Sequence, residues 1–255
     1  MVSCQPKKVS GVVDIMESAT PLSFIPDNPC AACEIRELSI CGTLQGDEFQ
    51  ALLDILRKQE ARNRDPLISE GDPADYVFNV TSGAIKLYKL MADGRRQITG
   101  FLFEGDFLGI AMYDEYPYSA EAIGRVNLCR FDRRKLRNLL ETFPKLEHRL
   151  LSIASNEIAQ AQDQMLLLGR KTAREKLCSF LMALSKRMED RGRDPSILFV
   201  PMSRADIGDY LGLTTETVSR TFTALKRSNV IRLLEGNRVM INEPDTLQDM
   251  ADGID

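Results

Sequence analysis

The stretch Met202-Ser-Arg-Ala-Asp-Ile-Gly-Asp-Tyr-Leu-Gly-Leu-Thr-Thr-Glu-Thr-Val-Ser-Arg-Thr-Phe222 decides the fold of the C-terminal part of this chain. Ser203 and Asp206 have the spacing of a capping box, which predicts the start of a short helix. Gly212 follows as a turn residue that tolerates a positive φ, and Thr214 suits the N-cap of a second helix. The stretch therefore predicts two short helices joined by a tight turn, as in a helix-turn-helix.

The second helix of this stretch has an apolar face and a polar face. Val218, Phe222 and Leu225 recur at helical spacing and are expected to point inward. The opposite face, near the N-terminal end, carries Thr215, Glu216, Ser219 and Arg220. Arginine can donate two hydrogen bonds to guanine, glutamate can accept one from cytosine, and serine can contact a base or a phosphate. This face suits the DNA major groove, and a small helical bundle without a binding role is the alternative.

The charge distribution agrees with a nucleic-acid surface in this region. Between Gly169 and Met240, 14 Lys and Arg residues stand against 8 Asp and Glu residues, although the whole chain has a net charge of −4. A basic block inside an acidic protein indicates where nucleic acid binds, although a solvated charged face would look the same. Residues 230–234 and 238–241 flank Glu235-Gly-Asn237 and predict a β-hairpin, or wing, after the second helix.

Length and composition favour a soluble protein with two modest domains, because the chain has 255 residues, of which 44% are apolar. No apolar run approaches the ~18 residues of a membrane helix, and residues 1–28 lack the apolar core of a secretory signal. We therefore expect a cytoplasmic protein, in which cysteines are metal ligands or free thiols more often than disulfides.

The middle of the chain has the pattern of short strands. Four glycines recur every 11 or 12 residues, at Gly71, Gly83, Gly94 and Gly105. The segments between them are rich in β-forming residues, and Asp93-Gly94 is a hairpin turn signal. This spacing predicts an antiparallel barrel or jelly roll between residues 65 and 132.

Residues 145–168 predict one long helix with a coiled-coil seam. The seam residues, spaced alternately by three and four, are Leu151, Ala154, Ile158, Ala161, Met165 and Leu168. Such a seam predicts a parallel homodimer, and the two alanines would let the helices approach closely. An ordinary amphipathic helix packed on its own domain is the alternative.

Four cysteines are candidates for a metal site. Cys30, Cys33 and Cys41 form a compact N-terminal set, and Cys129 lies in a predicted strand almost 90 residues later. A zinc or iron–sulfur site needs a fourth ligand beyond the compact set. On the segment alone, structural zinc and scattered free thiols remain alternatives. The single histidine, His148, excludes a histidine-rich zinc site.

Three groups of motifs together resemble the cyclic-AMP-receptor/FNR superfamily of bacterial transcription regulators, and its oxygen-sensing FNR branch in particular. They are Ser82-Gly-Ala-Ile-Lys-Leu-Tyr with Gln97-Ile-Thr-Gly-Phe, Gln164-Met-Leu-Leu-Leu-Gly-Arg-Lys, and the helix-turn-helix stretch from Asp206 to Arg220. The resemblance runs from about Cys30 to Ile241. The Cys-x2-Cys-x7-Cys spacing is similar to that of FnrN/FixK-type proteins and departs from the shorter last gap of the enteric form.

The resemblance implies an α+β fold with an N-terminal β-roll, a long dimerisation helix and a C-terminal winged helix-turn-helix. The domains it implies are a cysteine-rich cluster-binding segment (29–45), a β-roll sensory domain (46–140), a dimerisation helix (141–169) and a winged helix-turn-helix (170–245). The lack of periodicity over residues 1–28 adds a flexible leader, and the charge pattern adds an acidic tail (246–255).

The resemblance also implies a function. Cys30, Cys33, Cys41 and Cys129 look like the ligands of a [4Fe-4S] cluster that favours the homodimer in the absence of oxygen. The dimer would bind a TTGAT-type palindrome in double-stranded DNA through the recognition helix and recruit RNA polymerase, mainly as an activator. The loop Met91-Ala-Asp-Gly-Arg95 is a candidate polymerase contact. Ala161 stands where a charged residue would weaken the cluster-free dimer.

Two other functions compete with this one. A cyclic-nucleotide-responsive regulator of the same fold would hold the phosphate with an arginine beside Ser-Ala, but this chain reads Tyr118-Ser-Ala-Glu, so the phosphate would lack its bidentate partner. An enzyme or electron carrier would leave the recognition helix unexplained, and no glycine-rich phosphate loop accompanies the cysteines. We therefore expect a non-enzymatic regulator.

Overall fold

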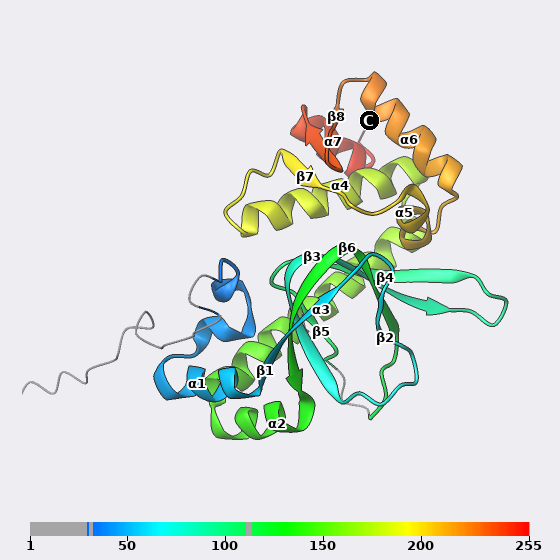
Figure 1. Cartoon of the computed structure of the whole chain (residues 1–255). Coiled ribbons are helices and arrows are strands. Elements are labelled where there is room, and N and C mark those ends of the chain that lie inside the picture. The colour runs from blue at the N-terminus through cyan, green and yellow to red at the C-terminus, as the bar shows by residue number, and fades with distance from the viewer. Residues whose placement is uncertain (1–29, 31–32, 111–113, 255) are drawn as a thin grey trace, which may run out of the picture.

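A computed structural model of the protein describes residues 30, 33–110 and 114–254. The leader expected over residues 1–28, with Cys4, lies outside the described residues. The molecule has a β-roll in its N-terminal half, a long helix that passes behind the roll, and a smaller helical domain above it (Figure 1). The predicted α+β fold is confirmed.

Six antiparallel strands form the β-roll. They are β1 (Leu56–Ala61), β2 (Pro66–Ile68), β3 (Tyr76–Leu90), β4 (Arg96–Leu102), β5 (Phe107–Leu108) and β6 (Ser119–Asp132). The main path of the sheet runs β1-β6-β3-β4, while β2 pairs with β6 and β5 pairs with β3. The predicted turn at Gly94, where φ is +84°, joins β3 to β4 in a long hairpin.

Alternation along the strands separates two apolar clusters. Phe78 and Leu128 face the inside of the roll, whereas Val77 and Phe131, an odd number of residues away on the same strands, face outward. The outward cluster is covered by the N-terminal segment, which comprises the 3-10 turns η2 (Arg36–Leu38) and η3 (Ile40–Thr43) and the helix α1 (Gly46–Ile55). Side chains on this part of the outer face of β3 and β6 therefore lie beneath the cysteine segment.

Two helices lead from the roll to the C-terminal domain. Asp132 caps α2 (Arg133–Thr142) by accepting a hydrogen bond from the Lys135 amide at 3.0 Å. Pro144, at the first helical position, begins α3 (Pro144–Arg170), which confirms the long helix expected at 145–168. Among the described residues, no helix is long and apolar enough to cross a membrane.

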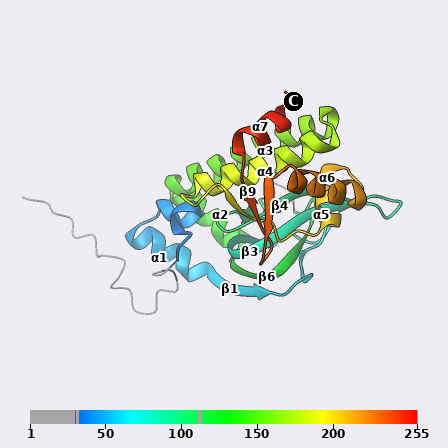
Figure 2. The same ribbon diagram turned by 90° about the horizontal axis from the view of Figure 1, so that it is seen from above.

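The C-terminal domain packs helices against a small sheet. Its elements are α4 (Ala173–Asp190), β7 (Ile197–Phe199), α5 (Arg204–Leu211), α6 (Thr215–Arg227), β8 (Ile231–Leu234), β9 (Arg238–Ile241) and α7 (Pro244–Asp252). Strands β8 and β9 form the predicted wing, and β7 pairs with β9. Seen from above, this domain lies over the β4 side of the roll (Figure 2).

The acidic tail expected over residues 246–255 contains structure that the sequence analysis did not predict. Most of it belongs to α7, which packs against α4 and buries Leu247 and Ala251 in the core of the C-terminal domain. The acidic residues of α7 therefore belong to an amphipathic helix whose apolar side stabilises the domain.

Candidate nucleic-acid interface and cysteine site

The local structure of the helix-turn-helix follows its capping residues. Ser203 and Asp206 form a reciprocal capping box, in which the Ser203 amide donates to Asp206 Oδ2 at 3.2 Å and the Asp206 amide donates to Ser203 Oγ at 3.0 Å. Gly212 has a φ of +64° and ends α5. Thr214 Oγ1 accepts from the Thr217 amide at 3.2 Å and begins α6. The predicted starts of both helices and the turn between them are confirmed.

Gly208 has a role that the sequence analysis missed. A Cβ at this position would lie 2.6 Å from the carbonyl oxygen of Leu213, so only glycine lets the backbone of the turn come this close to α5. The signal available in the sequence was a glycine inside a short helix, where it is otherwise unfavourable by about 1 kcal/mol.

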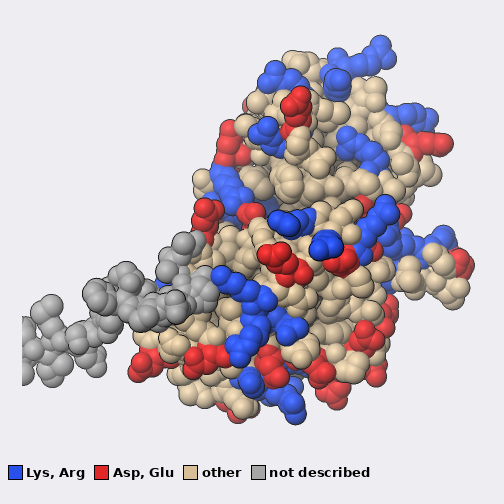
Figure 3. Space-filling model, viewed as in Figure 1, with Lys and Arg blue, Asp and Glu red and all other residues tan. Residues whose placement is uncertain are grey.

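The outward face of α6 presents the predicted polar residues. Thr215, Glu216 and Arg220 are exposed and Ser219 is half-buried, while Val218, Phe222 and Leu225 are buried as predicted. A shallow groove on this face is lined by Ser219, Arg220, Thr223, Ala224 and Arg227. Figure 3 shows several Lys and Arg side chains, with a few acidic ones among them, over this upper part of the molecule, whereas acidic and basic side chains lie together along the lower edge of the roll. The face therefore combines base-reading chemistry with positive charge.

The four predicted metal-ligand cysteines lie together. Cys30, Cys41 and Cys129 are buried and Cys33 is half-buried, and all four belong to the apolar cluster between the N-terminal segment and the outer face of the sheet. Cys30, Cys33 and Cys129 line one shared pocket, with Lys58 at its edge. The fold thus brings Cys129 to the N-terminal set, which spacing alone could not do.

The electrostatics of this cluster disfavour free thiolates. Burial, together with the nearby Cys30, Cys41 and Cys33, raises the pKa of the Cys129 thiol to about 12. Lys58 lowers this pKa, but its effect is smaller. Burial likewise raises the pKa of Cys41 to about 11. Thiolates at these positions need a compensating positive charge, which a bound metal supplies.

The four thiol sulfurs do not converge on a single metal position. Within the described residues, no group of three or more His, Cys, Asp or Glu side chains is placed to hold a single metal ion. A lone zinc ion needs thiolates that converge to about 2.3 Å from it, whereas an iron–sulfur cluster spreads its ligands over several irons. The donor set, four cysteine sulfurs in a buried apolar setting, has the chemistry that such a cluster requires.

The cysteine segment is held by local contacts. The Arg36 guanidinium lies 4.4 Å from the centre of the Phe49 ring and donates to the Leu44 carbonyl at 3.0 Å. Ser39 Oγ accepts from the Cys41 amide at 3.1 Å and so caps η3. These contacts fix the backbone around Cys41.

Arg149 ties the same segment to α3. Its guanidinium donates to the carbonyl oxygens of Leu38 at 2.6 Å, Ser39 at 3.3 Å and Glu37 at 3.4 Å. A shift of the backbone at residues 37–39, between Cys33 and Cys41, would therefore alter these hydrogen bonds to α3. No local pattern predicts this contact, because Arg149 lies more than 100 residues from its partners.

An apolar stripe on α3 is left uncovered by the described residues of the chain. Leu151, Ile158 and Met165 are 59%, 62% and 71% exposed, although large apolar side chains spaced in this way usually lie in a core or an interface. Ala154 is half-buried and Ala161 exposed, while Leu168 packs toward the C-terminal domain. The stripe matches the predicted seam, and it is the surface that a second helix would cover.

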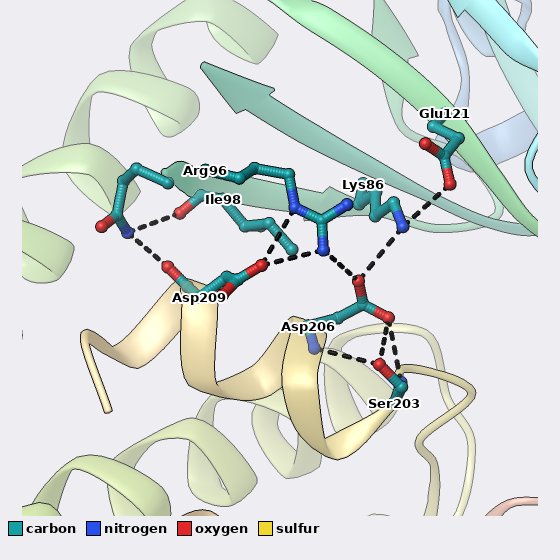
Figure 4. Close-up of polar contacts among 8 residues, drawn as sticks. Lys86, Arg96, Ile98, Glu121, Ser203, Asp206 and Asp209 are labelled. Atoms are coloured by element: carbon teal, nitrogen blue, oxygen red, sulfur yellow. Dashed lines mark hydrogen bonds and ion pairs between the residues drawn. The ribbon is translucent and has the colours of Figure 1, made fainter. Parts of the chain in front are cut away.

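A polar network joins the β-roll to the helix-turn-helix (Figure 4). Lys86 Nζ lies 2.9 Å from Glu121 and 3.1 Å from Asp206. Arg96 contacts Asp206 at 3.1 Å and Asp209 at 2.8 Å. Burial raises the pKa of the Asp206 carboxyl, but the hydrogen bonds from Ser203 and Lys86 and the Lys86 charge outweigh this, so the pKa lies below its ordinary value.

Apolar and further ionic contacts complete this junction. The Tyr210 ring packs 5.1 Å from Phe101 of β4 and 5.7 Å from Phe180 of α4, measured between ring centroids. Arg187 of α4 and Arg191, the residue that follows this helix, pair with Asp106 in the loop before β5. The Tyr210 ring thus packs against the core of its own domain and also contacts the roll.

Comparison with known proteins agrees with this architecture. A family model described as "Cyclic nucleotide-binding domain" matches residues 58–143, and one described as "Crp-like helix-turn-helix domain" matches residues 175–250. The nitrogen fixation regulation protein FixK of Bradyrhizobium diazoefficiens is 38% identical over 222 residues, covering 87% of this chain and 93% of FixK. The transcriptional activatory protein AadR of Rhodopseudomonas palustris is 42% identical over 212 residues, covering 82% and 87%.

A solved structure is similar over most of the chain as well. The structure of FixK2 from Bradyrhizobium japonicum superposes with a TM-score of 0.72 and 33% identity, covering 77% of this chain and 97% of FixK2. These relatives are transcription regulators, not enzymes, and the Crp-like helix-turn-helix match makes this chain a DNA-binding transcription regulator as well. The chain belongs to the CRP/FNR family, whose members bind DNA and act as dimers.

Proposed function

We propose that this regulator responds to oxygen through a [4Fe-4S] cluster held by Cys30, Cys33, Cys41 and Cys129. The observation that carries the proposal is that the fold joins three cysteines of the N-terminal segment to one of β6 in a single buried cluster. The bound group would supply the chemistry that reacts with oxygen.

The protein's own residues would couple this site to DNA binding. The thiolates of Cys41 and Cys129 are stable only with a positive group beside them, since burial raises the pKa of both thiols. Without it, these buried thiols would be protonated and the cysteine segment would be free to move. Arg149 would pass the movement to α3, because it holds the carbonyls that precede Cys41.

The proposed output is a change in the dimer. The exposed residues Leu151, Ile158 and Met165 would pack against the same stripe of a second copy, with Ala154, Ala161 and Leu168 completing the seam. A change at the cysteine site affects DNA binding only if it favours one of two packings of this helix.

The paired recognition helices would read a TTGAT-type palindrome. We assign Glu216, Ser219 and Arg220 to base edges and Thr215 to the same surface, on the grounds of their position on the outward face of α6. In a dimer the two helices would lie about 34 Å apart, one turn of DNA. The hairpin around Met91, which is 46% exposed, is the proposed contact for RNA polymerase in the cytoplasm.

The test is the metal content of protein purified without oxygen. We expect about four iron and four sulfide per chain, with a visible absorption band that air bleaches. Cys129→Ser should lose the iron, and Cys178→Ala, a control in the core of the C-terminal domain, should keep it. Zinc in place of iron, or DNA binding that requires a cyclic nucleotide, would reject the proposal and leave the family assignment intact.

A further inference from the structure

Cys129 lies in the middle of a row of side chains across three strands. The register pairs it with Lys58 on β1 and with Asn79 on β3. Directly opposed residues of antiparallel strands point to the same face, with their Cβ atoms about 4.5–5.5 Å apart. Lys58 and Asn79 therefore flank Cys129 on the face that the cysteine segment covers.

Asn79 is an unusual residue for this position. It is only 2% exposed, and its same-face neighbours Val77 and Phe131 are apolar. Within the described part of the chain, its Oδ1 has no hydrogen-bond partner. Burying an unpaired polar group costs about 1–3 kcal/mol, and a β-branched apolar residue would suit the strand better. The described protein groups therefore do not explain why a carboxamide is buried at this position.

The chemistry of the carboxamide suits sulfur in two states. Its carbonyl oxygen can accept a weak hydrogen bond from a thiol, and its NH₂ group can donate to a thiolate or a sulfide, which only accept. The oxygen and nitrogen exchange places when the amide turns by 180°. Asn79 Oδ1 has no hydrogen bond within the described residues that this turn would have to break.

We propose that Asn79 is a positioning residue of the cysteine site, which donates an N–H of its carboxamide to the Cys129 thiolate or to a sulfide of the bound cluster. This inference rests on the proposed function and adds a residue outside the four ligands. The hydrogen bond fixes the direction of the Cys129 side chain and stabilises negative charge on sulfur. Hydrogen bonds to cluster sulfurs tune the reduction potential, and outer partners of this kind change metal affinity by roughly 10- to 100-fold.

The test uses two variants of matched shape, Asn79→Val and Asn79→Thr. Both are β-branched and fit a strand, but only threonine keeps a donor. Anaerobic protein is titrated with an iron chelator while its visible spectrum and reduction potential are followed. We expect Asn79→Val to hold iron about tenfold less tightly than the unaltered protein, with a lower potential and a shifted sulfur-to-iron absorption band. Asn79→Thr should fall between the two.

The metal-free proteins separate this role from a structural one. Metal-free Asn79→Val should melt at the same temperature as the unaltered protein or higher, since it removes an unpaired buried amide. Lower iron affinity in a protein that is no less stable supports the proposal, whereas iron affinity and spectra equal to those of the unaltered protein overturn it. Absence of iron and sulfide from the unaltered protein would instead overturn the proposed function itself.

Discussion

Arg220 and Arg227 are two arginines of α6 that line the same groove but are expected to have different roles. Arg220 lies near the N-terminal end, where side chains reach base edges, so Arg220→Ala should cost about 1–3 kcal/mol on the specific site. Arg227 lies in the last turn, within reach of a phosphate. Arg227→Ala should weaken binding to all sequences and reduce the salt slope by about one. Fluorescence anisotropy with specific and scrambled duplexes at several salt concentrations distinguishes the two, and equal losses on both duplexes for Arg220→Ala would contradict the assignment.

Two helical glycines should respond to the same substitution with opposite sign. Gly208→Ala places a Cβ 2.6 Å from the Leu213 carbonyl oxygen, and such overpacking costs about 1–3 kcal/mol. Gly169, in the last turn of α3, has nothing within 4 Å of its Cβ position, so Gly169→Ala should stabilise by about 0.4–1 kcal/mol. Urea unfolding of both variants measures this, and a stable Gly208→Ala protein would show that the turn can shift.

These residues show what a sequence reveals at this scale. Ser203, Gly212 and Thr214 could be predicted because each acts on its immediate neighbours in the chain. Gly208 must lack a Cβ because the carbonyl of Leu213, five residues later in the turn, lies against it. The surroundings of the buried Asn79 side chain are set by its neighbours on strands β1 and β6. Neither follows from local pattern, because both depend on how elements pack.

Among the elements, α3 has the exposed apolar stripe that we propose as the dimer interface, and a single substitution can test it. Ile158 is 62% exposed in the middle of the stripe, so Ile158→Asp places a charge in the proposed seam and should shift the protein from dimer to monomer. Asn156→Asp adds the same charge on the exposed face away from the seam and is the matched control. Sedimentation velocity at micromolar concentration measures the change. A dimer that survives Ile158→Asp would place the interface elsewhere.

The junction between β3, β4 and α5 should give stability that depends on pH. The pKa of the Asp206 carboxyl lies below its ordinary value of 3.8, so the unfolded state binds the proton more readily. The stabilisation by the ionised Asp206 is complete above the unfolded-state pKa, about 3.8, and is lost as the pH falls through the lower pKa of the folded state. Asp206→Asn should flatten this acid dependence, measured as unfolding free energy at pH 7 and near pH 3. An unchanged slope would mean that other carboxylates dominate.

At this scale, prediction from sequence succeeded for elements and failed for contacts between them. The periodicity of α3 and the turn signals of the roll and wing are local, and all these elements are present. Lys86 and Asp206 are separated by 120 positions, and both have ordinary local explanations, as a strand residue and as a capping residue. Their pairing appears only once the two domains are placed together.

For the whole molecule, the order of its parts follows from the sequence, and their mutual placement follows from the fold. A resemblance in motifs was enough to expect a roll, a long helix and a winged helix-turn-helix. It was not enough to show that one apolar cluster runs from Phe101 of the roll into the core of the C-terminal domain. This continuity joins the roll to the C-terminal domain, while Arg149, toward the other end of α3, joins that helix to the cysteine segment.

The most direct measurement of the central claim is DNA binding by one anaerobic sample before and after exposure to air. The account predicts tight binding to a TTGAT palindrome without oxygen, and binding weaker by roughly 5- to 150-fold after air, in step with loss of iron. Cys129→Ser should bind weakly in both conditions. Equal affinity before and after air, in protein that has lost its iron, would contradict the account.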